Sequence, residues 1–415
     1  MKRGNKLFYG WWIVAGGFIL NFLGVGIGIN AIPVFLKPVV TDLQFNRGDF
    51  SLYFTIVALT MTFGAPLAGK LLEKYNVRIV MGASTLLLAA GFAAYSLCTT
   101  LTEFYIVSFF VGVGHAAAHI IPVSMLITNW FNKKRGLAMG VVFTASGLGG
   151  LFFSPVANHI ITEYGWRNGY LALGLLIGVF CVPCAFFVMR KSPAEVGQLP
   201  DGAKAGSSAT AVVEESGFSV GQAVKSPVFW LLVVMIFLID AQAMGIQQHL
   251  PAYLTDRGRS ASFAANLLGF YLGMIAVGKI ILGYVSDRFG SGTGFAIFTC
   301  VLGGSLMFLF NTEELWSLAL FAIAFGFGNA VITVSLPLMT AACFGMKNFG
   351  VIFGLLTIAN ALGAAVGTPG VGYLYDTTGS YNTAIWISVV ITFVALAAGV
   401  LAMRLSSRAM AGTQA

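Results

Sequence analysis

The chain has 415 residues, of which 58% are hydrophobic and only 9% are charged. Soluble domains carry roughly a quarter charged residues, so this composition excludes an ordinary soluble protein and indicates an integral membrane protein. The net charge of +8 is distributed over short polar segments between apolar runs, which does not fit a nucleic-acid-binding face.

Twelve apolar runs in the sequence are long enough to cross a bilayer as helices, each of which needs roughly 20 residues. The runs are continuous rather than alternating, which favours helices over the strands of a barrel. The sequence therefore predicts an all-α membrane protein. The expected spans are approximately 9–36, 49–72, 78–98, 104–127, 136–161, 168–189, 227–254, 264–285, 293–310, 315–341, 349–374 and 383–403.

Positive charges are unevenly distributed between the two sides of the predicted membrane. Lys and Arg are frequent on the side of the N-terminus, whereas Arg47, Arg257 and Arg259 are among the few on the other side. Positively charged loops stay in the cytoplasm, so we expect cytoplasmic termini and a location in the inner cell membrane. The first run follows Met1-Lys-Arg-Gly-Asn-Lys without a convincing cleavage site, which indicates a retained first helix.

Two histidines lie one helical turn apart in the fourth span. His115 and His119 share a helix face, and their counterparts in the second half, Asn329 and Thr333, are also polar. This symmetry suggests a cavity lining, where a histidine could bind a carboxylate or take a proton. Alternatively, both histidines could bond a neighbouring helix. Zinc is not expected, because no third ligand is placed.

One long polar segment divides the chain, because residues 191–226 are rich in Gly, Pro, Ser and charged residues. We predict an N-terminal six-helix bundle at 1–190, a cytoplasmic linker at 191–226 and a C-terminal six-helix bundle at 227–415. The two halves repeat at a shift of 214 residues. Examples of the matches are Gly136 with Gly350, Gly140 with Gly354, Pro155 with Pro369 and Gly165 with Gly379. Paired pseudo-symmetric bundles are an architecture of many secondary transporters.

The seventh span contains an acid and a histidine at membrane depth. Asp240 is the only acid placed deep in a span, and it could pair with Lys279, carry a proton or pack between helices. His249 lies near the far end of the span, just before Pro251. We expect His249 to line a cavity or an extracellular gate.

The eighth span contains a lysine in a long apolar run, and this lysine is Lys279. A charge at this depth costs a few kcal/mol or more, so a partner, a cavity or a bound anion must offset it. A structural lysine paired with an acid is the alternative, but no acid lies within a turn of Lys279 on its own helix. We predict that Lys279 binds the carboxylate of a small anion.

Other polar residues within the spans could bond a substrate or a neighbouring helix. We include four of them as candidate binding residues, namely Asn30, Tyr271, Asn329 and Asn360. The Cys181-Val-Pro-Cys184 pair lies in an apolar run and is interpreted as packing. We find no Walker-type loop, haem motif or metal cluster, so we expect neither a cofactor nor enzymatic activity.

Two related segments carry a resemblance to a known family. Gly69-Lys-Leu-Leu-Glu-Lys-Tyr-Asn-Val-Arg78 resembles the cytoplasmic signature of the major facilitator superfamily, with Glu73 in place of the usual Asp. Gly283-Tyr-Val-Ser-Asp-Arg-Phe-Gly290 is its copy in the second half. A glycine allows close helix approach, and an acid beside bases forms a charge latch. The residues of this latch are Gly69, Glu73, Lys74, Arg78, Gly283, Asp287 and Arg288.

Two further segments narrow the resemblance. Phe8-Tyr-Gly-Trp-Trp12 and the run that starts with Trp130-Phe-Asn-Lys-Lys-Arg-Gly136 resemble signatures of the monocarboxylate transporters, a pattern shared by bacterial oxalate/formate antiporters. The resemblance implies a proton-coupled transporter of lactate- or pyruvate-like monocarboxylates that works by alternating access. It implies a small carboxylate, protons and the lipid bilayer as partners, and a functional monomer. The alternatives are a carboxylate exchanger of the oxalate/formate type and a non-transporting carboxylate sensor.

The chain departs from this family near the expected site. Lys279 stands where the family has a carboxylate-binding Arg, Ile275 replaces the family Asp, and Asn30 replaces a family Lys. No basic residue occurs in 349–374, where the oxalate carriers have one. One cation favours a monocarboxylate over a dianion, and a proton route must use other groups, for which Asp240, His115 and His119 are the candidates.

Overall fold

The computed structural model describes residues 8–201, 217–345 and 347–412, with side chains up to Ser406. Within these ranges the regular structure is helical, and the β-type pairing is limited to two isolated bridges, Phe131 with Asp201 and Gly217 with Gly345. The predicted all-α class is confirmed. Residues 202–216 of the expected linker, and the positive charges expected at the extreme N-terminus, lie outside the described residues.

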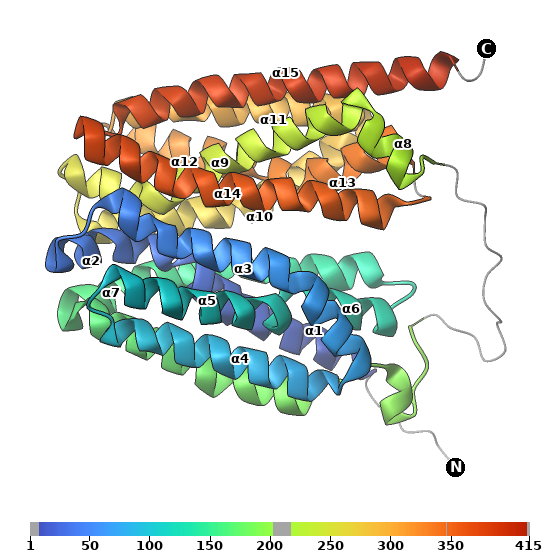
Figure 1. Ribbon diagram of the computed structural model, residues 1–415, viewed down its shortest axis with the longest axis horizontal. Helices are drawn as coiled ribbons and strands as arrows, with labels where there is room; N and C mark the ends of the chain where they lie inside the picture. Colours follow the sequence, from blue (N-terminus) through green and yellow to red (C-terminus); the bar gives the residue numbers. More distant parts are fainter. Residues whose placement is uncertain (1–7, 202–216, 346, 413–415) are drawn as a thin grey trace. The chain divides into compact units, whose positions relative to one another are not determined.

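The chain forms two compact units that do not coincide with contiguous halves. Unit 1 comprises Met1–Leu43 and Ile56–Thr210, whereas unit 2 comprises Gln44–Thr55 and Ala211–Ala415. The helix α3, Arg47–Lys74, therefore begins in unit 2 and continues in unit 1. Figure 1 draws α3 as one continuous helix. No break in the helical hydrogen bonding separates these two parts of α3.

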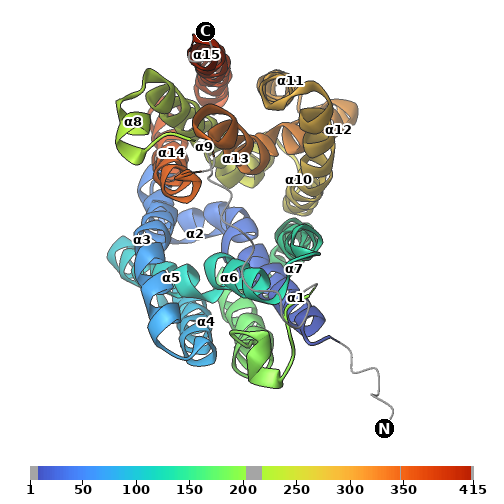
Figure 2. The same cartoon turned by 90° about the vertical axis from the view of Figure 1, so that its right-hand side faces the viewer.

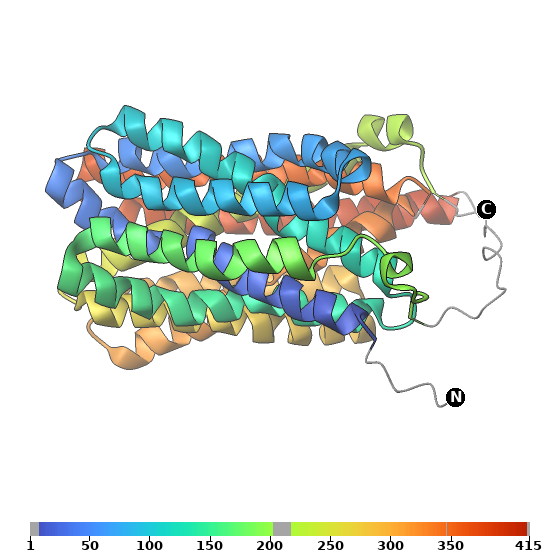
Figure 3. The same cartoon turned by 90° about the horizontal axis from the view of Figure 1, so that it is seen from below.

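Among the described residues, unit 1 contains eight further α- or π-helical segments and three short 3₁₀ turns. Its helices are α1 Gly10–Ile19, the π-helix η1 Leu20–Asn30, η2 Ile32–Phe35, α2 Leu36–Leu43, α4 Val77–Ala94, η3 Tyr95–Leu97, α5 Leu101–Ala118, α6 Ile120–Trp130, α7 Arg135–Pro183, the π-helix η4 Cys184–Val188 and η5 Pro193–Val196. The helix α4 runs alongside both α5 and α7, and η1 packs against α7 (Figure 3).

Unit 2 contains the remaining helices. They are α8 Val220–Lys225, α9 Pro227–Asp256, α10 Ala261–Phe289, α11 Ser291–Ser305, η6 Leu306–Phe310, α12 Leu315–Asn329, α13 Val331–Phe344, α14 Phe349–Thr378 and α15 Asn382–Gly412. The helix α9 packs between α14 and α15, and α10, α11 and α12 form a neighbouring group (Figure 2).

Eleven segments of the described chain are long and apolar enough to cross a membrane, whereas the sequence predicts twelve. The difference arises in Arg135–Val188, a segment of 54 residues that includes both the expected fifth and sixth spans. Gly165 interrupts this segment with φ 83° and ψ 160°, a conformation that costs a residue with a Cβ far more than glycine. The helices on either side of Gly165 meet at this kink, and no loop separates them.

Close backbone contact shapes the first span, which is not a regular α-helix. A Cβ on Gly26 would lie 2.6 Å from the Cα of Gly149 in α7, so only glycine permits this approach of η1 to α7. From Leu20 to Asn30 the first span continues as the π-helix η1. Such π segments occur frequently at functional sites, and η1 ends at Asn30.

Candidate functional site

The two histidines of the fourth span come together in unit 1. Their ring centroids lie 5.3 Å apart, and His119 occupies the non-helical junction between α5 and α6, with φ −127° and ψ −92°. Both side chains are buried, and Nε2 of His115 and both ring nitrogens of His119 have no hydrogen-bond partner in the described structure. Burying a polar group without a partner costs free energy, so these nitrogens are available to a ligand or a proton.

Glycines of η1 make room for these rings. A Cβ on Gly28 would lie 2.7 Å from His115 Nε2, and a Cβ on Gly24 would overlap the ring of His119. The run Gly24-Val-Gly-Ile-Gly28 therefore presents bare backbone to the histidines. Asn30 follows this run, but its Nδ2 donates to the backbone oxygen of Ser146 in α7 at 2.8 Å, which is a bond between helices.

A hydrogen-bonded chain crosses three helices inside unit 2. Asn329 Nδ2 of α12 donates to the hydroxyl of Tyr271 at 2.6 Å, and that hydroxyl donates to Gln247 Oε1 of α9 at 2.9 Å. All three side chains are buried, and Gln247 Nε2 is left without a partner in the described structure. Tyr271 and Asn329 are candidates from the sequence, whereas Gln247 is not. Its occurrence seven residues after Asp240, on the same face of the helix, is the signal that could have indicated it.

Asp240 lies on α9, about two helical turns before Gln247. It is 2% exposed, and its Oδ1 has no hydrogen-bond partner among the described residues. Both polar atoms of Gln242, two residues further along α9, are also buried without a partner. Among the described residues, α9 therefore carries a buried acid and buried amides with polar atoms that have no hydrogen-bond partner.

Lys279 is separate from this group. Its side chain is half-buried in α10, and its ammonium forms no ion pair or hydrogen bond with any described residue. Lys279 is eight residues from Tyr271, about 12 Å along the helix axis. The proposed pairing of Lys279 with Asp240 is not present in this structure, so the cation remains available to an anion.

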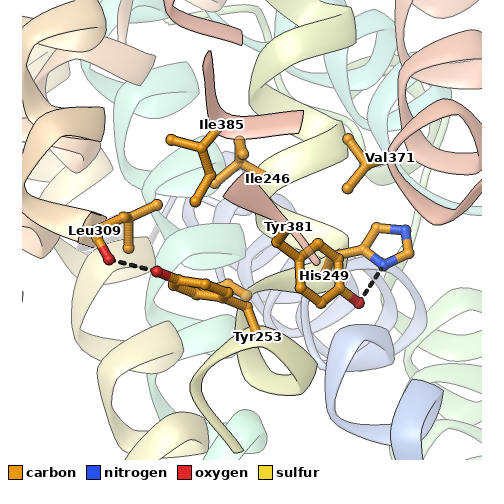
Figure 4. Close-up of a pocket in the computed structure, with 8 residues that line it drawn as sticks. Ile246, His249, Tyr253, Leu309, Val371, Tyr381 and Ile385 are labelled. Carbon is orange, nitrogen blue, oxygen red and sulfur yellow. Dashed lines mark hydrogen bonds between the residues drawn. The ribbon is translucent and has the colours of Figure 1, made fainter. Parts of the chain in front are cut away.

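The other two candidates differ from each other. Asn360 of α14 has a buried Oδ1 without a partner in the described structure. His249, in contrast, is saturated: its ring nitrogens contact the Thr368 carbonyl oxygen at 2.9 Å, the Tyr381 hydroxyl at 3.1 Å and Ser51 Oγ at 3.3 Å. Its ring borders a small pocket whose other lining includes Ile246, Val371 and Ile385 (Figure 4).

The first copy of the expected latch contacts the beginning of the linker. Lys191 Nζ donates to the carbonyl oxygens of Leu72 and Glu73 at 3.1 and 2.9 Å, which caps the end of α3. Arg78 Nη2 lies 3.3 Å from Glu195 Oε2. A Cβ on Gly69 would meet no atom within 4 Å, so this glycine does not mediate close helix packing among the described residues.

The second copy of the latch is more open. Arg288 Nη1 donates to the hydroxyl of Tyr284 on its own helix at 3.1 Å. Gly283, like Gly69, has open space where a Cβ would lie. In the first copy, by comparison, the ammonium of Lys74 lies 5.5 Å from the ring centroid of the neighbouring Tyr75.

The two aromatic signatures form one cluster in unit 1. Phe8 lies 5.8 Å from Trp130 and 5.4 Å from Phe131, measured between ring centroids, and Trp11 lies 5.3 Å from Phe131. Trp130 Nε1 also donates to the Arg190 carbonyl oxygen at 2.9 Å. These contacts hold the start of α1, the end of α6 and the start of the linker together.

Among the described residues, eleven long apolar helices define a multi-pass membrane protein, and several polar groups buried in these helices have no hydrogen-bond partner. The family model of the Major Facilitator Superfamily matches residues 14–293 and 255–413, and the chain belongs to this superfamily. Its members in the comparisons below are transporters rather than enzymes.

Among curated relatives, the chain is similar to monocarboxylate transporter 13 of Bos taurus, with 26% identity over 380 residues that cover 90% of this chain and 84% of the relative. It is equally similar to monocarboxylate transporter 4 of Rattus norvegicus, with 26% identity over 383 residues, 90% of this chain and 79% of the relative. The resemblance to monocarboxylate transporters is thus confirmed.

Solved structures support the fold. A bacterial homologue of the human lysosomal transporter Spinster, in an inward-facing and unoccupied conformation, matches with a TM-score of 0.75 and 16% identity, covering 98% of this chain and 99% of the other. A mutant of the nucleoside transporter NupG matches with a TM-score of 0.76 and 12% identity, covering 94% of this chain and 99% of the other.

Proposed function

We propose that this chain is a proton-coupled secondary transporter of small monocarboxylates such as lactate or pyruvate, working by alternating access. The observation that carries the proposal is the unpartnered ammonium of Lys279 within a membrane-spanning helix. Its relatives named monocarboxylate transporters support the same substrate class.

Placing the ammonium of Lys279 within a membrane span costs free energy. A cation within a span is destabilised by loss of hydration, and a bound carboxylate would offset that cost by forming a charge-assisted bond. The span of α14 contributes no second cation, so a dianion would retain an uncompensated charge. A monocarboxylate leaves the pair neutral, which favours movement of the loaded protein.

The remaining candidates supply hydrogen bonds and proton sites. Tyr271, Asn329 and Asn360 of unit 2 are assigned to the hydroxyl, keto or carboxylate oxygens of the substrate, with Gln247 as an added member of that group. In unit 1, His115, His119 and Asn30 are the candidate cavity residues. We retain His249 as a candidate for the wall of the cavity.

Three groups are assigned to proton coupling. Asp240, His115 and His119 each have a buried oxygen or nitrogen without a partner in the described structure. If the Asp240 carboxylate takes up the proton it becomes neutral, and because the substrate carboxylate neutralises Lys279 the loaded site then carries no net charge in the membrane from these groups. A histidine that takes up the proton instead adds one positive charge, which a further anionic group must offset. Ile275 replaces the acid that monocarboxylate transporters have beside their cation, so the route would be this chain's own.

The test measures uptake of labelled lactate, pyruvate, formate and oxalate into proteoliposomes with and without an inward proton gradient. Lys279→Gln should lower uptake at least tenfold, equivalent to about 1.4 kcal/mol of lost binding or transition-state stabilisation, whereas Lys279→Arg should retain part of it. Arg259→Gln is the matched control, because Arg259 bonds loop carbonyls of Thr312 and Glu313 at the membrane edge. Undiminished uptake by Lys279→Gln would remove the role assigned to Lys279.

A carboxylate exchanger is the second candidate. The replacement of the family acid by Ile275, four residues before Lys279, favours it because the familiar proton partner is absent. Counterflow that continues without a pH gradient, together with no net uptake, would select exchange. Ligand-dependent thermal stabilisation without any flux would instead select the sensor.

The placement in the cell is part of the proposal. We infer an inner-membrane location with both termini in the cytoplasm, and bundles at 1–190 and 227–415 joined by the linker 191–226. The distribution of Lys and Arg supports this orientation. We also propose that the monomer is functional.

A further inference from the structure

A compact polar network, here named the clasp, holds the first turns of α3 within unit 2. Arg47, only 9% exposed, donates from Nη1 to Asp256 Oδ2 at 2.6 Å and to the Tyr381 hydroxyl at 2.6 Å. Its guanidinium carbon lies 3.9 Å from the ring centroid of Tyr375. The clasp comprises Arg47, Ser51, His249, Asp256, Thr368, Tyr375, Asp376 and Tyr381.

The start of α3 is capped by the same network. Asp376 accepts hydrogen bonds from the backbone N–H groups of Arg47 at 3.1 Å and Gly48 at 2.7 Å. A carboxylate at a helix N-terminus satisfies free N–H groups and interacts favourably with the helix dipole. Further along α3, Thr55 Oγ1 donates to the Ala365 carbonyl oxygen at 2.7 Å. The contacts of α3 with α14 therefore continue past the first turn.

The hydrogen-bond partners determine the proton position on His249. The Thr368 carbonyl oxygen can only accept, and Ser51 already donates its O–H to the Arg47 carbonyl oxygen at 2.6 Å. Both groups therefore accept from His249 Nε2–H. Nδ1 then carries no proton and accepts from the Tyr381 hydroxyl (Figure 4). The Tyr381 oxygen in turn accepts from Arg47.

Tyr381 is suited to this relay position. It lies between α14 and α15 rather than within a span. Burial, the largest effect, raises the pKa of its hydroxyl, although the neighbouring Arg47 lowers it. The phenol therefore keeps its proton and can donate to His249. The relay runs in one direction, from the Arg47 guanidinium through the Tyr381 hydroxyl to neutral His249.

We propose that His249 Nδ1 is a proton-binding site and that its protonation opens the clasp. A proton on Nδ1 turns this atom from an acceptor into a donor, so the Tyr381 hydroxyl can no longer donate to it. The Tyr381 oxygen would then face two cations, Arg47 and the imidazolium. Their mutual repulsion weakens the bonds that hold Arg47.

The groups that face His249 support this consequence. From α3 these are Arg47 and Ser51, from α9 Tyr253 and Asp256, and from α14 and the following loop Thr368, Tyr375, Asp376 and Tyr381. Asp256 and Asp376 are the acids in this set, and both already accept hydrogen bonds from the Arg47 side chain or backbone. A protonated His249 would therefore compete with Arg47 for hydrogen bonds to these acids, because both acids already accept from Arg47.

The clasp lies at the start of α3, so its opening changes how the first turns of this helix are held. From Ile56 onward, α3 belongs to unit 1, while its first residues are held in unit 2 by the clasp. Release of the first turns would detach the start of α3 from α9 and α14 without breaking the helix. The inference goes beyond the proposed substrate class and is independent of which solute the protein carries.

The test uses thiol accessibility in the full-length protein without substrate. In a variant whose five cysteines are replaced by serine or alanine, Ala365→Cys places a single thiol under α3, where Ala365 is 4% exposed. Its labelling rate by a hydrophilic maleimide is measured in nanodiscs between about pH 7.5 and 4.5, a range that extends below the titration of an exposed imidazole because His249 is buried close to the Arg47 guanidinium. Rates are corrected for the pH dependence of thiolate formation with the exposed native Cys300 as the sole thiol in a parallel protein.

We expect corrected labelling of the Ala365→Cys thiol to rise by roughly threefold or more on acidification. His249→Gln, whose amide can reproduce the neutral donor and acceptor, should label slowly at every pH, and His249→Asn serves if that variant does not fold. Asp256→Asn should label fast at every pH, and Arg259→Gln should behave as the parent. A pH-independent parent, or a His249→Gln protein that keeps the parent's pH response, would overturn the proposal. Because no carboxylate is present, failure of the proposed function leaves this readout unchanged.

Discussion

Individual polar residues inside the membrane spans fall into two groups in this protein. Lys279, His119 and Asp240 retain atoms without described partners, whereas His249 and Asn30 are engaged with neighbouring groups. Unfilled bonding capacity at membrane depth is destabilising unless a ligand or proton uses it. The first group therefore provides the better candidates for binding, and the second for holding helices together.

Tyr271→Phe tests whether the buried chain in unit 2 contributes to stability and to binding. The change leaves Gln247 Oε1 and Asn329 Nδ2 without their partner, which should cost about 1–3 kcal/mol. We expect a lower melting temperature in detergent and a higher KM for carboxylate uptake. Tyr164→Phe, at an exposed phenol, is the control. Equal melting temperatures and KM values for both variants would contradict the prediction.

Gly28→Ala tests the fit between η1 and the histidine pair. The new methyl group would lie 2.7 Å from His115 Nε2, so the ring must move, and overpacking of this kind costs about 1–3 kcal/mol. We expect loss of both thermal stability and uptake. Gly140→Ala, at a helical position with no atom within 4 Å, should be neutral or slightly stabilising. A Gly28→Ala protein as active and stable as Gly140→Ala would show that the ring position is unimportant.

At the scale of elements, backbone irregularities determine where the helices place these side chains. The π-helix η1 passes Gly24 and Gly28 along the histidine rings, and the break at His119 ends α5 at the same level. In the long segment from Arg135, Gly165 provides the positive φ at which the chain turns. At η1 and at Gly165 glycine reduces the cost of the irregularity, because it permits close contact and a positive φ.

Gly165→Ala should destabilise unit 1. A residue with a Cβ at φ 83° is strained by about 1–2 kcal/mol, although no atom lies within 4 Å of the new methyl group. Gly136→Ala, in the first turn of the same segment and with equally open surroundings, is the matched control. Thermal unfolding followed by tryptophan fluorescence measures the difference. If the two variants melt together, strain at Gly165 is not significant.

At the scale of the whole molecule, the chain is a multi-pass transporter of the Major Facilitator Superfamily whose third α-helix belongs to two compact units. The internal repeat would place a boundary within the linker, but the contacts of Gln44–Thr55 assign this short segment to unit 2. The first residues of α3 form charged and polar hydrogen bonds with other residues of unit 2, and these bonds make up the clasp.

The orientation in the membrane gives a test at this scale. A thiol at Ser192→Cys, in the linker region, should react with an impermeant maleimide only after the inner membrane is opened, because positive loops remain cytoplasmic. A thiol at Ser262→Cys, an exposed position in the first turn of α10, should react in intact spheroplasts. Both are introduced into the cysteine-free protein. The reverse pattern would invert the proposed topology.

Sequence periodicity alone was sufficient for the helical class and for most span positions, because apolar length is set by the thickness of the bilayer. It also identified Lys279, His115, His119 and Asp240, since polar groups are conspicuous in apolar runs. It did not distinguish saturated from unsaturated groups. His249 and Asn360 are equally polar in the sequence, yet only the fold supplies His249 with three partners.

The amino-acid sequence by itself therefore determined the membrane-spanning all-α class, the family resemblance and the presence of isolated polar groups in the spans. These properties depend on composition and on residue spacing along single helices. The tertiary structure alone decided which groups meet, such as Gln247 with Tyr271 and Arg47 with Asp256. Such pairs join residues far apart in the chain, and hydrogen bonding at 2.6–3.1 Å depends on helix packing that no local pattern encodes.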